Sequence, residues 1–240
     1  MSAWAVGDVH GMSARLEALL DRLDGRADAL VFLGDYWDKG PDSPGVLDRL
    51  IALAGRRRCT FLLGNHEFAW LRYLAGEARE AFLLRYGGVA TLSAYAGRAL
   101  GEAEAAAVLA DRGRVRALFP PAHLAFVEGL VASHDTGAAL CVHGALSRGF
   151  GDAELADHAL EALVFNRWDR DGDDRTWRGR VIVCGHTPRA TRPVAALATV
   201  CIDTGACLED GRLTALDLET FTWVQDDGTT GTAAPAALAA

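Results

Sequence analysis

The chain opens with Ala3-Trp4-Ala5-Val6-Gly7-Asp8-Val9-His10-Gly11, an apolar run that ends in a glycine, a carboxylate and an imidazole. A similar order returns in Ala29 to Asp35, and again in Cys59 to Asn65-His66-Glu67. Short apolar runs bounded by glycine are typical of buried strands. The sequence therefore predicts three successive strands, each followed by side chains that can bind metal ions.

Helical patterns separate these strands. Ser13 to Leu23 and Pro44 to Ala54 carry apolar residues three and four positions apart, which predicts an amphipathic helix after each of the first two strands. Such alternation indicates an α/β layered domain. Later apolar runs follow one another closely, with glycines between some of them, so we expect antiparallel hairpins and therefore mixed sheets. These runs are Leu140 to Val142, Val181 to Cys184, Val194 to Leu197, Thr199 to Ile202, Leu213 to Leu218 and Phe221 to Val224.

The domain organisation follows from the same patterns. We expect one domain over residues 1–225, and within it a helical insert over 68–131 that is broken at Gly87-Gly88 and Pro120-Pro121. A short helical stretch is expected near Ala153 to Leu160. Residues 226–240 are rich in Gly, Thr and Ala, which predicts a disordered tail.

The composition of the chain excludes some classes of partner and location. The 240 residues are half hydrophobic and carry a net charge of -8, with basic residues scattered apart from Arg56, Arg57 and Arg58, so we expect no duplex nucleic acid as a partner. No apolar run approaches the roughly 18 residues of a membrane span, and no secretory signal pattern opens the chain, which predicts a cytoplasmic protein. The five cysteines lack CxxC spacing and are expected as free, buried thiols.

Two further predicted strands end in histidine, at Val142-His143-Gly144 and Gly185-His186-Thr187. One polar residue after a strand is ordinarily a turn or a helix cap. Five strand ends of one ligand chemistry indicate a site, because ligands of α/β sheets lie beyond the carboxyl ends of strands. Carboxylate, imidazole and amide groups without thiolates suit Mn²⁺, Fe²⁺ or Zn²⁺. A pair of such ions about 3.5 to 4 Å apart clamps an in-line displacement at phosphorus, and Asp35 is the candidate bridging carboxylate.

Five segments resemble, in order along the chain, the motifs of the calcineurin-like metallophosphoesterases. They are Gly7 to Gly11, Gly34 to Gly40, Gly64 to Glu67, His143-Gly144 and Gly185-His186. More narrowly they resemble the bacterial branch of the serine/threonine phosphoprotein phosphatases. Ile202-Asp203-Thr204-Gly205 is similar to the closing strand and turn of that family. The resemblance implies a fold in which two mixed β-sheets pack as a sandwich flanked by helices.

The resemblance also implies roles for the strand-end residues. One metal ion, most simply Mn²⁺, would be held by Asp8, His10 and Asp35, and a second by Asp35, Asn65, His143 and His186. A water or hydroxide between the ions would attack phosphorus. His66 would protonate the leaving oxygen, oriented by Asp38. Arg167, in Phe165-Asn166-Arg167-Trp168, resembles a phosphate-gripping arginine, and Asn65 and Lys39 are expected to contact the phosphate as well.

One residue departs from the pattern. Where the family's second motif usually ends in Asp-Arg-Gly, this chain has Asp38-Lys39-Gly40, and Lys39 is its only lysine. The change replaces a planar bidentate donor with a point charge. A Lys-Gly-Pro ending resembles a relative of the symmetrical dinucleoside tetraphosphatases, whereas Asp38, Glu67 and Thr187 resemble the phosphatases.

Three functions remain open from the sequence. The first is hydrolysis of phosphomonoesters, foremost phosphoserine and phosphothreonine in proteins, with small phosphoesters as other substrates. The second is hydrolysis of dinucleoside polyphosphates. The third is a binding module that retains the fold without activity, which the complete set of candidate ligands disfavours. Native metal, physiological substrate and oligomeric state are not specified by the sequence.

Overall fold

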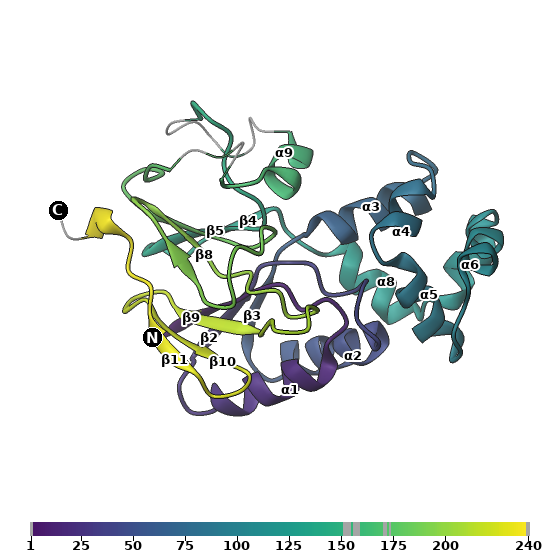
Figure 1. Cartoon of the computed structure of the whole chain (residues 1–240), viewed down its shortest axis with the longest axis horizontal. Helices are drawn as coiled ribbons and strands as arrows, with labels where there is room; N and C mark the ends of the chain where they lie inside the picture. The colour runs from purple at the N-terminus through teal and green to yellow at the C-terminus, as the bar shows by residue number, and fades with distance from the viewer. Residues whose placement is uncertain (1, 151–154, 156–158, 170–171, 173, 239–240) are drawn as a thin grey trace.

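Two β-sheets pack face to face at the centre of the molecule, with helices on their outer faces (Figure 1). The structure is a computed structural model that describes residues 2–150, 155, 159–169, 172 and 174–238. One sheet has six strands in the order β11-β10-β9-β1-β2-β3, and the other has five in the order β4-β5-β6-β8-β7. The predicted sandwich of two mixed sheets is thereby confirmed.

The six-stranded sheet combines a parallel and an antiparallel half. Strands β1, β2 and β3 are parallel, since helices α1 and α2 return the chain to the same edge each time. The other half is antiparallel throughout: β9 pairs with β1, β10 pairs with β9, and β11 pairs with β10. The bounds are β1 Ala3–Val6, α1 Ser13–Arg22, β2 Ala29–Phe32, α2 Ser43–Ala54, β3 Arg58–Phe61, β9 Thr214–Asp217, β10 Thr222–Gln225 and β11 Thr230–Thr232.

The five-stranded sheet is also mixed. Strands β5, β6 and β8 are parallel, whereas β4 and β7 pair antiparallel at the two edges. The β7–β8 and β9–β10 pairs are antiparallel, as their close spacing in the sequence predicted. The bounds are β4 Ser133–Asp135, β5 Ala139–Val142, α9 Leu160–Phe165, β6 Val181–Cys184, β7 Val194–Ala195 and β8 Thr199–Cys201.

The core follows from the alternation of side chains along each strand. Ala5 and Val31 of the first sheet point inward and pack against Cys141 and Val183 of the second. Their neighbours point outward instead: Trp4, Val6, Leu30 and Phe32 pack under α1 and α2, whereas Leu140 and Ile182 pack near α9. Because both faces of the central strands are covered, these strands are apolar throughout.

Between β3 and β4 the described chain is helical, in the region expected as an insert, and these helices lie beside the sheets in Figure 1. Trp37, in the loop after β2, anchors them, because its ring contacts Trp70 at 5.6 Å and Phe119 at 5.5 Å between centroids. The bounds are α3 Asn65–Leu74, α4 Ala81–Arg85, α5 Gly88–Ala96, α6 Glu102–Leu109, α7 Arg112–Leu118 and α8 Pro121–Glu128.

The prediction of a disordered tail from residue 226 is wrong, because residues 230–232 form β11 and Ala236–Leu238 form a 3-10 helix, η2. Thr230, Gly231 and Thr232 pair with β10, and a Cβ at Gly231 would clash with the ring of Trp223. Ladder hydrogen bonds use the backbone alone, so a strand can add to an existing edge without apolar side chains. Most of the helical stretch expected near 153–160 lies outside the described residues.

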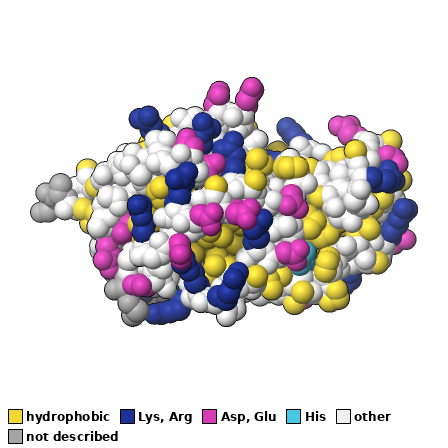
Figure 2. Space-filling model, turned by 90° about the horizontal axis from the view of Figure 1, so that it is seen from below, with side chains coloured by type: hydrophobic (Ala, Val, Ile, Leu, Met, Phe, Trp, Pro, Cys, Tyr) yellow, Lys and Arg dark blue, Asp and Glu magenta, His cyan; other side chains and the backbone are white. Residues whose placement is uncertain are grey.

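The face formed by α1 and α2 carries acidic and basic side chains side by side (Figure 2). Glu17 and Asp21 of α1 lie near Arg49 of α2 and the following Arg56, around a groove between the two helices. This face therefore has no large area of a single sign. Among the described residues, no helix is both long enough and apolar enough to cross a membrane.

Candidate metal centre

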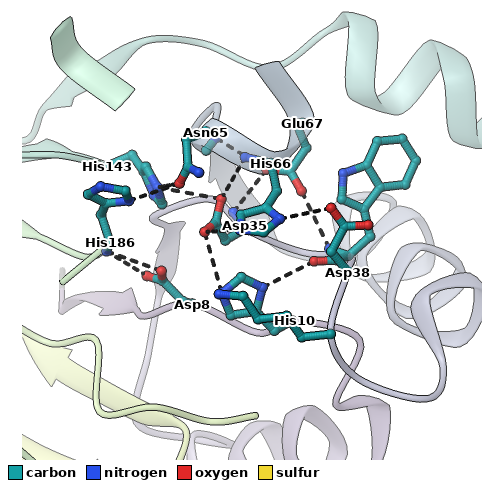
Figure 3. Close-up of polar contacts among 12 residues, drawn as sticks. Asp8, His10, Asp35, Asp38, Asn65, His66, Glu67, His143 and His186 are labelled. Carbon is teal, nitrogen blue, oxygen red and sulfur yellow. Dashed lines mark hydrogen bonds and ion pairs between the residues drawn. The ribbon is translucent and has the colours of Figure 1, made fainter. Parts of the chain in front are cut away.

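All six predicted metal-ligand residues lie in one place, beyond the carboxyl ends of the parallel strands (Figure 3). Each sheet contributes. The loops after β1 and β2 carry Asp8, His10 and Asp35, and Asn65 is the first residue of α3, which follows β3. The loops after β5 and β6 carry His143 and His186. All six are buried except His186, which is partly exposed. The site thus lies where the ends of the two sheets meet.

Asp35 is at the centre of the cluster. Its Oδ2 lies 3.4 Å from Nε2 of His10, and its Oδ1 lies 3.4 Å from Nε2 of His143. Two groups of side chains could hold a metal ion, His10 with Asp35 and His66, and Asp35 with His143 and His186, each with ligand atoms within 4.8 Å of one another. Because Asp35 belongs to both groups and offers a different oxygen to each, its geometry suits a bridging carboxylate.

Asn65 and Asp8 occupy different positions around this centre. Oδ1 of Asn65 lies 3.0 Å from Nε2 of His143 and 2.8 Å from Nδ1 of His186, so it joins the second group. The carboxylate of Asp8 accepts hydrogen bonds from the backbone N–H of His186, at 3.2 Å to Oδ1 and 3.1 Å to Oδ2. His66, predicted as the proton donor, is the third member of the first group, where the sequence predicted Asp8.

The histidine rings are oriented for metal binding. Nδ1 of His10 lies 3.1 Å from the carbonyl oxygen of Trp37, and Nδ1 of His143 lies 2.8 Å from that of Leu33. A carbonyl can only accept, so each Nδ1 donates and each Nε2 keeps its lone pair for a ligand. These donors are the imidazole and oxygen types preferred by borderline divalent ions, and no thiolate is among them. The residues therefore fit a pair of such ions.

The backbone of the site is held in an uncommon conformation. Five of the seven described non-glycine residues with positive φ belong to it: His10 at 48°, Asp35 at 52°, Asp38 at 67°, Lys39 at 66° and His186 at 64°. Left-handed conformations cost free energy for residues with a Cβ and persist where the surrounding structure enforces them. Their concentration here indicates that the folded chain positions these side chains before any ligand arrives.

Glu67 supports the loop after β2 and was not predicted as a site residue. Its Oε2 accepts the N–H groups of Asp35 at 2.9 Å and Gly64 at 3.2 Å, and its Oε1 accepts that of Tyr36 at 2.8 Å. Burial raises the pKa of Glu67 to about 8. Its signal in the sequence is an acidic residue three positions after a strand-end glycine, the spacing of a helix-capping glutamate.

Asp38 and His66 form a buried pair, as expected. Nδ1 of His66 lies 2.8 Å from Oδ2 of Asp38. Asp38 also accepts hydrogen bonds from Nε1 of Trp70 at 3.0 Å and from Oγ1 of Thr91 at 2.6 Å. Burial lowers the pKa of His66, but the charges of Asp35 and Asp38 outweigh burial and raise it. Thr91 lies 53 residues from Asp38, and nothing in the sequence marked it.

Burial sets the charge of the other ligands. It lowers the pKa of His10 and of His143 below the usual value, and that of His186 to about 3, so these imidazoles are neutral at pH 7. Burial favours the neutral form of Asp35, but in the acidic range where Asp35 would take up a proton the surrounding histidines are protonated, and their charges with that of Lys39 outweigh burial and lower the pKa of Asp35. Asp8 has a raised pKa, through burial and the neighbouring carboxylate of Asp203. Neutral imidazoles beside a carboxylate are the forms that bind metal ions.

Two cations contribute positive charge to the cluster. Nζ of Lys39 is 2.8 Å from Nε2 of His10. Arg167 follows α9, and its positive charge contributes to the low pKa of His186. Lys39 is thus beside the first group, and the charge of Arg167 acts on the second, so both cations favour an anion bound at the cluster.

Asp203 is a further carboxylate that the sequence did not single out as a site residue. It follows β8, is 5% exposed, and accepts a hydrogen bond from the N–H of Gly205 at 3.0 Å. Burial raises the pKa of Asp203 to about 6. It therefore belongs to the electrostatic surroundings of Asp8.

Known proteins are similar to this chain over most of its length. The asymmetrical bis(5'-nucleosyl)-tetraphosphatase PrpE of Geobacillus thermodenitrificans is 30% identical over 91% of each chain. A solved structure described as a putative diadenosine tetraphosphatase is 21% identical, with a TM-score of 0.63 over 96% of this chain and 93% of the other. A cold-active protein-tyrosine phosphatase of a psychrophilic Shewanella species is 18% identical, with a TM-score of 0.60 over 97% and 80%. The family model for calcineurin-like phosphoesterases matches residues 1–218. The chain therefore belongs to the calcineurin-like phosphoesterase family and is a hydrolase of phosphoester bonds.

Proposed function

We propose that this chain hydrolyses dinucleoside polyphosphates at a phosphoanhydride bond. The observation that carries the proposal is the match to bis(5'-nucleosyl)-tetraphosphatases along 91% of both chains. Lys39, in place of the arginine usual in the second motif, supports it from the sequence. Hydrolysis of phosphoproteins was the first expectation, but the solved protein phosphatases that match are too distant in sequence to support more than the shared fold.

In this proposal Asp8, His10 and Asp35 hold one divalent ion, and Asp35, Asn65, His143 and His186 hold the other. When bound, such ions polarise phosphoryl oxygens and lower the pKa of a water. Lys39 and Arg167 hold the polyphosphate between them, with Asn65 at the second group. His66 donates its Nε2 proton to the leaving oxygen, because Nδ1 faces the carboxylate of Asp38 at 2.8 Å.

Turnover of three substrates tests the proposal. Metal-stripped protein reloaded with Mn²⁺ is assayed with diadenosine tetraphosphate, a phosphothreonine peptide and p-nitrophenyl phosphate, beside an Asp35→Asn variant. We expect kcat/KM for the tetraphosphate to exceed that for the peptide by at least about tenfold, with all activity lost in the variant. Preference for the peptide would instead establish the phosphatase.

The products define the cleavage. Asymmetrical hydrolysis of diadenosine tetraphosphate yields ATP and AMP, whereas symmetrical hydrolysis yields two ADP molecules. Since relatives that match about nine-tenths of the chain are named asymmetrical enzymes, we expect ATP and AMP in equal amounts on ion-exchange chromatography. ADP alone would assign the opposite cleavage.

A further inference from the structure

Four aromatic rings lie along one side of the metal centre, and we call them the aromatic rim: Phe68, Phe82, Tyr86 and Phe165. Their residues come from α3, from α4 and the position directly after it, and from α9. The ring of Phe82 contacts that of His66 at 5.9 Å between centroids, and the ring of Phe165 contacts that of His186 at 6.5 Å. The rim therefore touches both groups of candidate metal ligands.

Within the rim, Tyr86 differs from the other three rings. Phe68, Phe82 and Phe165 are half-buried and pack α3, α4 and α9 together through contacts of 5.9 Å and 5.8 Å. Tyr86 is 41% exposed, one of the few large hydrophobic side chains of the described chain that are. Phe82 supports it at 4.4 Å with an interplanar angle of 32°. The ring of Tyr86 is thus supported by Phe82, while part of the side chain remains exposed to solvent.

The backbone places Tyr86 beside the predicted phosphate contacts. The next residue, Gly87, accepts a hydrogen bond from the N–H of Lys39 at 3.3 Å. At Gly87, φ is 106°, and a Cβ would lie 2.5 Å from the backbone nitrogen of Lys39, so this approach requires glycine. The Nζ of Lys39 is in turn 2.8 Å from His10. The backbone contact between Gly87 and Lys39 therefore links the residue that carries the Tyr86 ring to the residue that carries the cation.

Positive charge accompanies these rings. The guanidinium of Arg85 lies over the ring of Tyr86, 5.4 Å from its centroid, and that of Arg72 lies over the ring of Phe68, 5.6 Å from its centroid. Aromatic rings with guanidinium groups beside them are the surfaces on which nucleobases stack, while the cations attract the phosphates. In a nucleotide, one ribose separates the phosphate from the base. In the rim, the ring of Phe82 lies between His66, in the metal centre, and Tyr86, and contacts both.

We propose that Tyr86, braced by Phe82, is the platform on which one nucleobase of the substrate stacks. This inference rests on the proposed function. Tyr86 would recognise the nucleoside of the substrate, whereas the other residues assigned to the site recognise only phosphate. Stacking tolerates any base, so Tyr86 distinguishes nucleotides from base-free phosphates and does not distinguish among bases.

Binding to the Mn²⁺-loaded protein tests the inference. The probes are a methylene-bridged diadenosine tetraphosphate, which is not hydrolysed at the bridges, and methylenediphosphonate, which has no base. Isothermal titration is carried out with Tyr86→Ala and with Tyr86→Phe, which keeps the ring. We expect Tyr86→Ala to weaken binding of the diadenosine compound by about 5- to 150-fold, which is the effect of removing one base–aromatic stack. The affinity for methylenediphosphonate should stay unchanged. Tyr86→Phe should bind both probes like the wild type.

Turnover provides a second readout. In Tyr86→Ala we expect KM for diadenosine tetraphosphate to rise by the same factor while kcat stays within about twofold, because stacking contributes equally to the ground and transition states. Leu197→Ala, at a residue that is 56% exposed, serves as the surface control. Equal weakening of both probes, or no weakening of either, would overturn the role of Tyr86.

The two proposals fail differently. If the wild type binds the diadenosine compound but does not hydrolyse diadenosine tetraphosphate, the proposed function is wrong, and the binding data on Tyr86→Ala still decide the inference. If Tyr86→Ala hydrolyses the tetraphosphate with unchanged KM, the inference alone is wrong.

Discussion

Asp35 connects the two groups of candidate ligands, because each of its carboxylate oxygens lies 3.4 Å from a different histidine. Its backbone N–H donates a hydrogen bond to Oε2 of the buried Glu67, which fixes the backbone that carries the side chain. A residue shared in this way makes the two metal positions interdependent, and removing it should affect both.

We predict that Asp35→Asn reduces Mn²⁺ binding at both positions. The amide keeps one acceptor oxygen and loses the negative charge, so one side of the bridge is lost. Since changes in residues that only support metal ligands cost about 10- to 100-fold in affinity, we expect at least that loss here. Metal content after dialysis and titration with Mn²⁺ measure it. Asp210→Asn, at an exposed carboxylate, is the matched control, and unchanged stoichiometry in Asp35→Asn would contradict the bridge.

His66 permits a prediction that depends on the leaving group. With its Nδ1 bound to Asp38, we expect Nε2 to deliver the proton, an effect worth about 10²- to 10⁴-fold where the leaving group is poor. His66→Asn should therefore reduce kcat far more for phenyl phosphate than for p-nitrophenyl phosphate, whose leaving group needs little protonation. Equal losses with both substrates would exclude a role as general acid and leave His66 as a metal ligand, since it also belongs to the first group.

At the scale of elements, the start of α2 links the second motif to the helix after it. The side chain of Asp42 accepts the N–H of Gly45 at 2.9 Å and the hydroxyl of Ser13 at 2.5 Å, so it caps α2 and joins it to the start of α1. Pro44 lies in the first turn of α2, where no backbone donor is needed. These contacts fix the exit of the loop that carries Asp38 and Lys39.

We predict that Asp42→Ala lowers the free energy of unfolding by about 1 kcal/mol, the usual value of a helix cap. Asp42→Asn keeps an oxygen that can accept the N–H of Gly45 and should cost clearly less. Urea unfolding followed by circular dichroism measures both variants. A loss as large in Asp42→Asn would show that the charge of Asp42, and not its capping oxygen, stabilises this end of α2.

At the scale of the whole molecule, the layer between the sheets excludes water from the ends of the strands that carry the site. Cys141 lies in this layer on β5, fully buried, two residues before His143. All five cysteines are free thiols, as predicted, although Cys59 and Cys207 are only partly buried. Burial raises the pKa of Cys141 to about 12.

The raised pKa predicts both reactivity and a pH dependence. Below about pH 9, the ordinary value for a thiol, Cys141 is neutral whether the chain is folded or unfolded. Above it, the unfolded chain loses this proton first, so the stability contributed by the neutral thiol is lost as the pH rises from about 9 to about 12. We expect Cys141 to resist iodoacetamide at pH 8 until urea unfolds the chain, as peptide mass spectrometry would show. Rapid labelling of Cys141 in the native protein would contradict the sealed layer.

Much of the site could be predicted because its information is local. An apolar run ending in glycine and a ligand residue specifies a strand together with the ligand in the loop after it, and parallel strands joined by helices bring their carboxyl ends to one edge. Asp35, Asn65 and His143 lie together for this reason. The hydrogen bond from Thr91 to Asp38, by contrast, spans 53 residues and leaves no periodic trace. The pairing of β11 could not be predicted from the sequence either, because it depends on hydrogen bonds between backbone groups.

The sequence by itself determined the family, the two-sheet class of fold and the residues that can bind metal, since these depend on the order of short motifs and on strand and helix periodicity. Only the tertiary structure decided how the ligands are shared. It placed Asp35 between the two groups, turned Asp8 toward the backbone of His186, and brought Gly87, which follows Tyr86, to the backbone N–H of Lys39. The physical reason is that side-chain distances across the site depend on how the two sheets and the helices after β3 pack against each other, and that packing is the sum of contacts between residues far apart in the chain.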